Sequence, residues 1–180
     1  MKRIKLYSIV SIDGYASPPD GSMDWIVEAQ VPCDMEYGIN SFYKGVGTVM
    51  MTLSHYLNLV SCELLEPHME KPCIIVRSRA DLEVFSQHSV EYITDDQQGF
   101  RLTAKYLADI KHTDDGDIWI AGDNKLIGAM LEAGVVDEVI ITMIPVVLGK
   151  GVKPFTVDFV NESKWRTVRV TKNEYGVAQV

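Results

Sequence analysis

Two short apolar runs, joined by a glycine turn and an amphipathic segment, constrain the fold of this chain most strongly. The first run, residues 118–121, has the length and composition of a buried strand. The turn at residues 122–124 reads Gly-Asp-Asn and supplies side chains that cap helices. Apolar residues then recur at helical spacing over 126–131, and a second apolar run covers 139–144. This order predicts a strand, a turn, a helix and a second strand.

Such a unit is typical of a right-handed parallel crossover. Its turn directs free backbone N–H groups and the positive end of the helix at one spot, which suits a phosphate group. The same pattern also fits an ordinary crossover with a capped helix and no ligand. Taken alone, the local pattern favours this second interpretation.

Composition limits the partners of the chain. Its 180 residues predict one domain with a substantial core, spanning residues 1–180. The net charge of −8 argues against nucleic acid or an anionic membrane surface as the main partner. No apolar run approaches the ~20 residues of a membrane span, and the apolar N-terminal run is interpreted as a first strand rather than a signal peptide.

The cysteines and histidines give no sign of a metal site. Cys33, Cys62 and Cys73 are odd in number and form no C-x-x-C motif, so neither a disulfide framework nor a thiolate site is expected. This usage fits a reducing cytoplasm. The four histidines have no ligand spacing, and each is interpreted as a surface or helix residue; they are His55, His68, His88 and His112.

The remaining patterns alternate between strands and helices until the C-terminus, where strands alone are expected. Further strands are predicted over 2–12, 47–51, 73–76, 90–94, 164–172 and 175–180, and further helices over 32–43, 53–60 and 100–110. This order predicts a three-layer α/β/α fold. Its central sheet has about eight mostly parallel strands, with helices on both faces and an antiparallel C-terminal edge.

Three features outside the central unit carry candidate site residues. Residues 13–22 form a Gly- and Pro-rich loop after the first strand, a place where sites of α/β proteins often lie. Trp25 fits a core aromatic and an apolar wall over a flat ligand equally well. Arg77 and Arg79 follow a predicted strand. This position fits two interpretations: the two guanidinium groups bind a phosphate, or they lie in a solvated turn.

Three blocks of this chain resemble the dihydrofolate reductase-like proteins of the riboflavin-biosynthesis reductase C-terminal-domain (RibD C-terminal) type. The first block is S-I-D-G-Y-A-S at 11–17, followed by D-W-I at 24–26. The second is I-W-I-A-G-D-N-K-L-I at 118–127. The third is G-V-V-D-E-V at 134–139 with P-V-V-L-G-K-G at 145–151. The resemblance covers nearly the whole chain.

The resemblance implies a nicotinamide cofactor, usually NADPH, with NADH as the other candidate, and a small heterocyclic substrate. It implies a cofactor site and a neighbouring substrate site with Asp13 and Trp25. The implied cofactor contacts are Ala16, Ser17, Thr52, Arg77, Ser78, Arg79, Gly122, Asp123, Asn124 and Lys125. Asp34 lies roughly where folate-reducing members place their acid, although it also fits a plain helix-start carboxylate. Relatives often form dimers, which implies a homodimer.

At two places the sequence departs from the family's usual pattern in a way that affects cofactor binding. Met51 and Thr52 replace the Gly and Arg of the family's usual G-R-x-T turn, which removes a charge-assisted phosphate contact. Asp123 replaces the second glycine of the usual Gly-Gly pair and puts a carboxylate where phosphate is expected. Asp123 is able to cap the helix itself and so compete with the cofactor for the same N–H groups.

Two hypotheses follow. The first is a reductase that transfers hydride from NADPH to a pterin-like or 5-amino-6-ribosylaminouracil-like substrate. The second is a non-catalytic descendant with the same fold and another ligand. No complete dinucleotide or Walker glycine motif supports a plain nucleotide-binding module.

Overall fold

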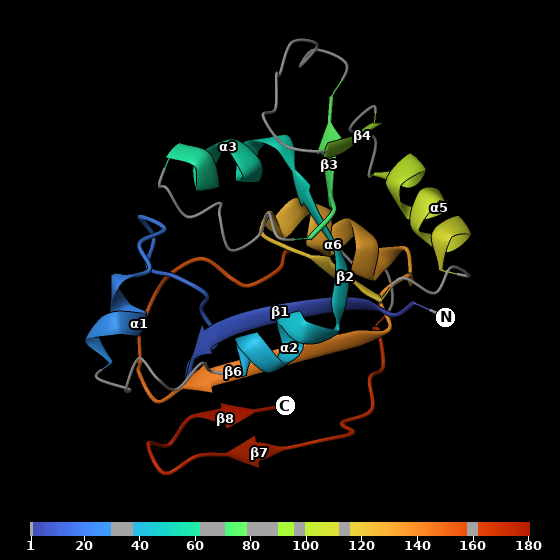
Figure 1. Ribbon diagram of the computed structural model, residues 1–180. Helices are drawn as coiled ribbons and strands as arrows, with labels where there is room; N and C mark the ends of the chain where they lie inside the picture. Colours follow the sequence, from blue (N-terminus) through green and yellow to red (C-terminus); the bar gives the residue numbers. More distant parts are fainter. Residues whose placement is uncertain are drawn as a thin grey trace.

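The fold is taken from a computed structural model that describes residues 2–29, 38–61, 71–78, 90–95, 100–111, 116–157 and 162–180. These residues form one eight-stranded sheet in the order β4-β3-β2-β5-β1-β6-β8-β7 (Figure 1). The strands are β1 (Ile4–Ser11), β2 (Val46–Thr52), β3 (Cys73–Arg77), β4 (Val90–Thr94), β5 (Asp117–Ile120), β6 (Glu138–Ile144), β7 (Thr171–Lys172) and β8 (Ala178–Gln179). The helices are α1 (Asp24–Glu28), α2 (Ile39–Gly45), α3 (Leu53–Ser61), α5 (Arg101–Ile110) and α6 (Asn124–Glu132).

Pairing in the sheet is parallel from β4 to β6 and antiparallel at the C-terminal edge. β5 and β6 lie on either side of β1 and both run parallel to it, so α6 connects two parallel strands across β1. β8 pairs antiparallel with β6, and β7 pairs antiparallel with β8. The predicted parallel crossover, the mostly parallel sheet and the C-terminal antiparallel hairpin are therefore confirmed.

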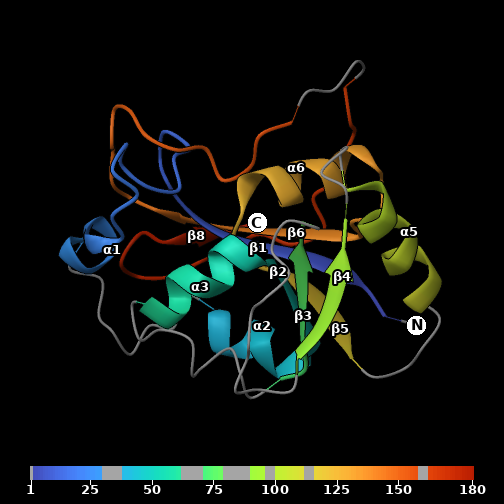
Figure 2. The same ribbon diagram turned by 90° about the horizontal axis from the view of Figure 1, so that it is seen from above.

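Two apolar layers hold helices against opposite faces of the sheet. On one face, Leu107 of α5 and Met130 of α6 pack with Ile118 and Ile120. On the other, Tyr56 of α3 and the partly buried Phe42 of α2 pack with Trp119. Consecutive residues of β5 thus point to opposite faces, as the period of a strand requires. Figure 2 shows α5 and α6 on one side and α2 and α3 on the other, which confirms the three-layer architecture.

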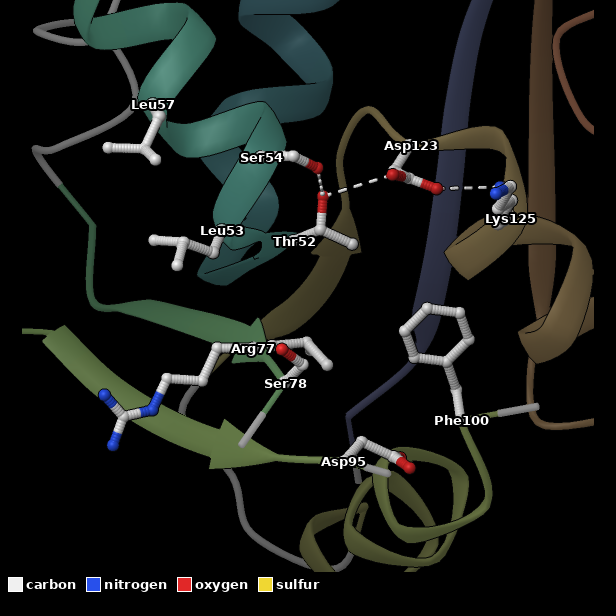
Figure 3. A pocket seen from close by; sticks show the side chains of 11 residues that line it. Thr52, Leu53, Ser54, Leu57, Arg77, Ser78, Asp95, Phe100, Asp123 and Lys125 are labelled. Carbon is white, nitrogen blue, oxygen red and sulfur yellow. Dashed lines mark hydrogen bonds between the residues drawn. The ribbon is translucent and has the colours of Figure 1, made fainter. Parts of the chain in front are cut away.

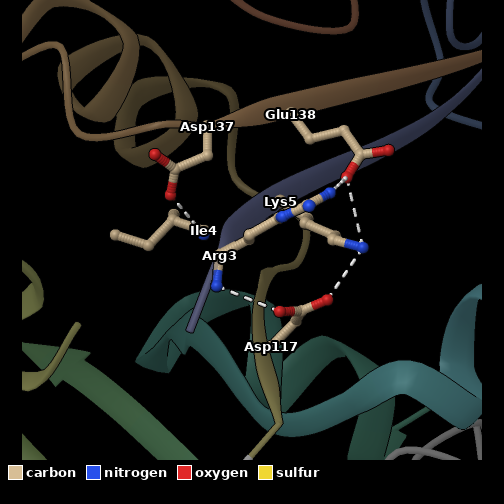
Figure 4. Close-up of polar contacts among 6 residues, drawn as sticks. All are labelled: Arg3, Ile4, Lys5, Asp117, Asp137 and Glu138. Carbon is tan, nitrogen blue, oxygen red and sulfur yellow. Dashed lines mark hydrogen bonds and ion pairs between the residues drawn. The ribbon is translucent and has the colours of Figure 1, made fainter. Parts of the chain in front are cut away.

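A charged cluster closes the amino-terminal edge of the sheet (Figure 4). The Lys5 ammonium lies 2.8 Å from Asp117 and 3.2 Å from Glu138, so one cation joins β1, β5 and β6. Burial alone lowers the Lys5 pKa, but the hydrogen bonds to the two carboxylates outweigh it and raise the pKa. This cluster lies at the amino ends of the strands, whereas ligands of such sheets bind at the carboxyl ends. It links the starts of three neighbouring strands.

One predicted strand is largely wrong. The sequence pattern predicts a strand over 164–172, but only residues 171–172 pair, and residues 162–170 are exposed along their whole length. Alternating β-branched residues favour an extended backbone, but they form a strand only where a neighbouring strand supplies hydrogen bonds. Trp165, Val168 and Val170 are consequently 50%, 73% and 64% exposed.

No helix among the described residues is long and apolar enough to cross a membrane.

Candidate functional site

Two cavities lie side by side at the carboxyl ends of the parallel strands. The smaller has a volume of about 440 Å³ and lies between the ends of β2, β3 and β4. The larger has a volume of about 820 Å³ and lies between β1, the loop after β1 and the amino end of α6. Both volumes fall within the range of about 300–1,000 Å³ that ligand sites occupy. The two cavities share Asp123 and Lys125, so the first turn of α6 separates and connects them.

The amino end of α6 is capped by its own chain. The Asp123 carboxylate accepts hydrogen bonds from the backbone N–H groups of Lys125 at 2.8 Å and Leu126 at 3.2 Å. Its other oxygen accepts a hydrogen bond from the Thr52 hydroxyl at 3.3 Å. The expected capping of α6 by Asp123 is therefore confirmed. Within the described part of the chain, the N–H groups of Gly122 and Asp123 donate no hydrogen bond.

Thr52 connects two helix starts. Its hydroxyl oxygen accepts a hydrogen bond from the His55 backbone N–H at 3.3 Å, which caps α3, and lies 3.0 Å from the Ser54 hydroxyl. The row Ser54, Thr52, Asp123 and Lys125 lies along one side of the smaller cavity (Figure 3). The amino ends of α3 and α6 thus converge on this cavity, and both carry a side-chain cap.

The opposite side of the smaller cavity carries Arg77, Ser78 and Asp95. Asp95 is buried and accepts hydrogen bonds from the backbone N–H and the hydroxyl of Thr103, both at 2.9 Å, so it holds the first turn of α5. In Figure 3 the guanidinium group of Arg77 extends away from Asp123 and Lys125. It is therefore not directed at the amino end of α6.

The wall of the larger cavity is made by two loops that are fastened together. Asp13 accepts hydrogen bonds from the Ser11 hydroxyl at 2.7 Å and from the N–H groups of Leu148 at 3.1 Å and Gly149 at 2.7 Å. These contacts lower the pKa of Asp13 to about 2, the Ser11 hydroxyl contributing most, although burial opposes them. The charged carboxylate therefore binds residues 146–149 to the loop after β1.

The same wall continues to α6. The Ala16 N–H donates a hydrogen bond to the Val152 carbonyl at 2.8 Å, and the Val152 N–H donates one to the Ser17 carbonyl at 2.9 Å. The side-chain amide of Asn124 donates to the carbonyl of Lys153 at 2.8 Å. A Cβ atom added at Gly151 would overlap the Ser17 carbonyl oxygen, so the close approach of the two loops requires glycine there.

The structure gathers most of the predicted site residues. Ala16, Ser17, Gly122 and Asn124 line the larger cavity, Thr52, Arg77 and Ser78 line the smaller, and Asp123 and Lys125 line both. Two others lie elsewhere. Asp13 braces the loops without lining either cavity, and Trp25 is 6% exposed in a core cluster with Ile144 and Val177. Asp34 and Arg79 lie outside the described residues.

Several cavity residues were not predicted as site residues from the sequence, among them three with aromatic rings in the larger cavity. His55, Tyr7 and Trp119 line the larger cavity. The Tyr7 hydroxyl lies 3.0 Å from the Thr142 hydroxyl, which also accepts a hydrogen bond from the Gln179 side chain at 2.9 Å. The one available signal for His55 is its place three residues after β2, at the edge of the sheet where the other site residues lie.

Comparison with known proteins identifies the class. Residues 2–178 match the family described as the RibD C-terminal domain, and the chain belongs to that family. The sheet and its helices are dihydrofolate reductase-like. The uncharacterized protein YwjB of Bacillus subtilis (strain 168) is 33% identical over 165 residues, which are 92% of this chain and 88% of YwjB.

Two solved structures are similar in fold. A putative riboflavin biosynthesis protein from Shewanella sp. PV-4 has a TM-score of 0.78 at 18% identity, covering 98% of this chain and 96% of that one. The Thermotoga maritima diaminohydroxyphosphoribosylaminopyrimidine deaminase/5-amino-6-(5-phosphoribosylamino)uracil reductase has a TM-score of 0.68 at 15% identity. That match covers 99% of this chain and 55% of the longer Thermotoga chain.

Proposed function

We propose that this protein is a single-domain reductase that transfers hydride from NADPH, or alternatively NADH, to a small heterocycle. The substrate class is pterin-like or 5-amino-6-ribosylaminouracil-like, as the family and the reductase named in the Thermotoga structure suggest. The observation that carries the proposal is the pair of cavities joined at Asp123 and Lys125. Together they provide an elongated site at the edge of the sheet where ligands of α/β proteins bind.

The described residues fit the proposed cofactor at its diphosphate. The N–H groups of Gly122 and Asp123 are available as donors at the positive end of α6. The Asn124 amide and the Lys125 side chain flank them in the larger cavity. We assign the cofactor's diphosphate to residues 122–125. We assign the additional phosphate group that distinguishes NADPH from NADH to Thr52, Arg77, Ser78 and Arg79.

The larger cavity suits the two reacting rings. Its walls combine the apolar side chains of Ile9, Met23 and Val152 with Ala16 and Ser17 of the first loop. The cofactor supplies the hydride, and the protein holds the two flat rings face to face and excludes water. Asp13 serves this site by holding its wall, and Trp25 supports it from the core. We assign proton transfer to Asp34.

A non-catalytic or diverged ligand-binding protein is the second candidate. It is favoured by one observation, the capping of α6 by Asp123, because the carboxylate already occupies two of the N–H groups that a phosphate would use. Affinity for an anionic cofactor is lowered both by this occupation and by the negative charge.

Direct measurement of dinucleotide binding distinguishes the reductase from the non-catalytic candidate. NADPH and NADH are titrated into ligand-free protein by calorimetry, and thermal unfolding is followed in parallel. Cofactor at a hundred times its dissociation constant is expected to stabilise the fold by about 2.7 kcal/mol. Absence of binding at millimolar concentrations of either dinucleotide would exclude the reductase and leave the second candidate.

We also propose that the protein is a cytoplasmic homodimer joined through residues 162–172. This segment is exposed, rich in β-branched residues, and leads into β7, the outermost strand of the sheet. Antiparallel pairing of two copies with Thr167 opposite Thr167 places Glu162 opposite Lys172 and Trp165 opposite Arg169. These are an opposite-charge pair and a cation–aromatic pair, each formed twice, and both stabilise neighbouring strands.

A further inference from the structure

His55 lines one of the two cavities that make up the proposed cofactor site. It lies in the first turn of α3, is half-buried and lines the larger cavity. Its imidazole ring lies directly against Gly122, since a Cβ atom added at Gly122 would overlap the ring. The ring is therefore next to the turn at residues 122–125, to which the proposed function assigns the diphosphate.

The charges of this cavity are balanced without the histidine. Among the described residues that line it, Asp123 and Lys125 are the charged side chains, and their charges cancel. A cofactor diphosphate brings one negative charge on each phosphate group. A neutral His55 gives these charges no net attraction, whereas a protonated His55 makes the lining positive.

Neighbouring groups do not replace this charge. The Arg77 guanidinium belongs to the smaller cavity and extends away from Asp123 and Lys125. Lys153 does not line the cavity, and its ammonium lies 4.0 Å from the centre of the Tyr15 ring. Tyr7 lines the larger cavity, but burial raises its pKa, so its phenol stays neutral in the range where histidine titrates.

We propose that protonated His55 binds the diphosphate of the dinucleotide and takes over the role of the guanidinium missing at position 52. This inference rests on the proposed function and adds a binding residue and a pH dependence to it. Dinucleotide affinity then rises as the pH falls through the histidine range, because the charged imidazolium is the form that attracts phosphate.

ADP-ribose is a suitable probe, because its diphosphate does not titrate in this range and it carries no nicotinamide. Binding is measured by calorimetry at about pH 5.5 and about pH 8, on either side of the ordinary histidine pKa of about 6.5. The unsubstituted protein is expected to bind about tenfold more tightly at the lower pH, as loss of one charge-assisted contact implies. His55→Gln is expected to bind weakly at both pH values, and His55→Arg tightly at both.

His55→Phe is the matched control, because it keeps an aromatic ring against Gly122 without the charge. It is expected to behave like His55→Gln, and thermal unfolding of each variant checks that the fold is intact. Equal affinity of the unsubstituted protein at both pH values, or an unchanged pH dependence in His55→Gln, overturns the inference while the proposed function stands. If ADP-ribose, NADPH and NADH all fail to bind at either pH, the proposed function fails as well.

Discussion

The Asp123 carboxylate and the Lys125 backbone N–H form a 2.8 Å hydrogen bond at the amino end of α6. A carboxylate of the protein thus lies where the family resemblance implies a cofactor phosphate. The two cavities on either side of it remain open. The helix end is therefore shared between a structural cap and a candidate ligand site, and the balance between them can be measured.

Replacement of Asp123 by glycine is expected to strengthen dinucleotide binding. The change frees the N–H groups of Lys125 and Leu126 and removes a negative charge, which together are expected to raise affinity for ADP-ribose about tenfold or more. Loss of the cap is expected to lower the free energy of unfolding by a few tenths of a kcal/mol. Calorimetric titration and urea unfolding measure the two effects.

Asp123→Asn separates charge from capping, because asparagine caps helices about as well as aspartate. It is expected to keep the stability of the unsubstituted protein and to show an intermediate affinity. If Asp123→Gly binds ADP-ribose no better than the unsubstituted protein, the carboxylate does not compete with the ligand.

The contact between Gly151 and Ser17 predicts a second substitution effect. In Gly151→Ala the new methyl group would overlap the Ser17 carbonyl oxygen, so the two loops must separate, at a cost of about 1–3 kcal/mol in the free energy of unfolding. Urea unfolding measures this loss. Gly45→Ala is the control, since no atom lies within 4 Å of its added Cβ and its position is the last of α2. A similar small effect of both substitutions would show that the loops are not held in close contact.

The low pKa of Asp13 predicts how the free energy of unfolding depends on pH. Its folded-state pKa of about 2 lies below the ordinary aspartate value of about 3.9, so the unfolded chain binds the proton more readily. The stabilisation from Asp13 is therefore complete above about pH 4 and is lost as the pH falls towards about 2. Asp13→Asn is expected to have a lower urea midpoint at neutral pH, and its difference from the unsubstituted protein is expected to shrink below about pH 4.

Glu174→Gln serves as the control for this acid series, because Glu174 is exposed in the turn between β7 and β8. It is expected to leave the urea midpoint unchanged across the series. A constant difference between Asp13→Asn and the unsubstituted protein at all pH values would show that the Asp13 charge does not hold the loops.

The proposed dimer register predicts a specific cross-link. Residues directly opposite in antiparallel strands have Cα atoms about 4.5–5.5 Å apart, which is within the range of about 4.4–6.8 Å that a disulfide spans. Thr167→Cys is therefore expected to give a disulfide-linked dimer under mild oxidation, seen on a non-reducing gel. Val170 is also exposed but lies opposite Lys164 in this register, so Val170→Cys is expected to link poorly. Equal linking of both variants, or of neither, contradicts the register.

The parts of the fold that depend on local pattern could be predicted from the sequence. Strand β5, helix α6 and strand β6 follow their apolar spacing, and the capping of α6 by Asp123 was expected from its place before the helix. The predicted strand did not form at residues 164–170, because strand pairing does not depend on local pattern alone. Their alternation favours a strand, but pairing depends on a distant neighbour that local sequence does not specify.

The site was predictable only where a motif lies in one stretch of chain. Residues 122–125 are contiguous, so their common place along the larger cavity was predictable, whereas the contact of His55 with Gly122 joins residues 67 positions apart. The family resemblance implied Asp13 as a substrate residue, whereas its contacts with Leu148 and Gly149 join distant parts of the chain and were not predictable. Trp25 fitted two interpretations until the packing around Ile144 and Val177 placed it in the core.

The fastened loops at residues 13–17 and 146–153 bear on redesign of this scaffold for new ligands. Their alignment comes from main-chain contacts, a braced carboxylate and a glycine, none of which uses the side chains that face the cavity. Ala16, Met23 and Val152 can therefore be randomised in a library without breaking the contacts that align the two loops. Diversity introduced at Asp13 or Gly151 would instead yield misassembled variants and few binders.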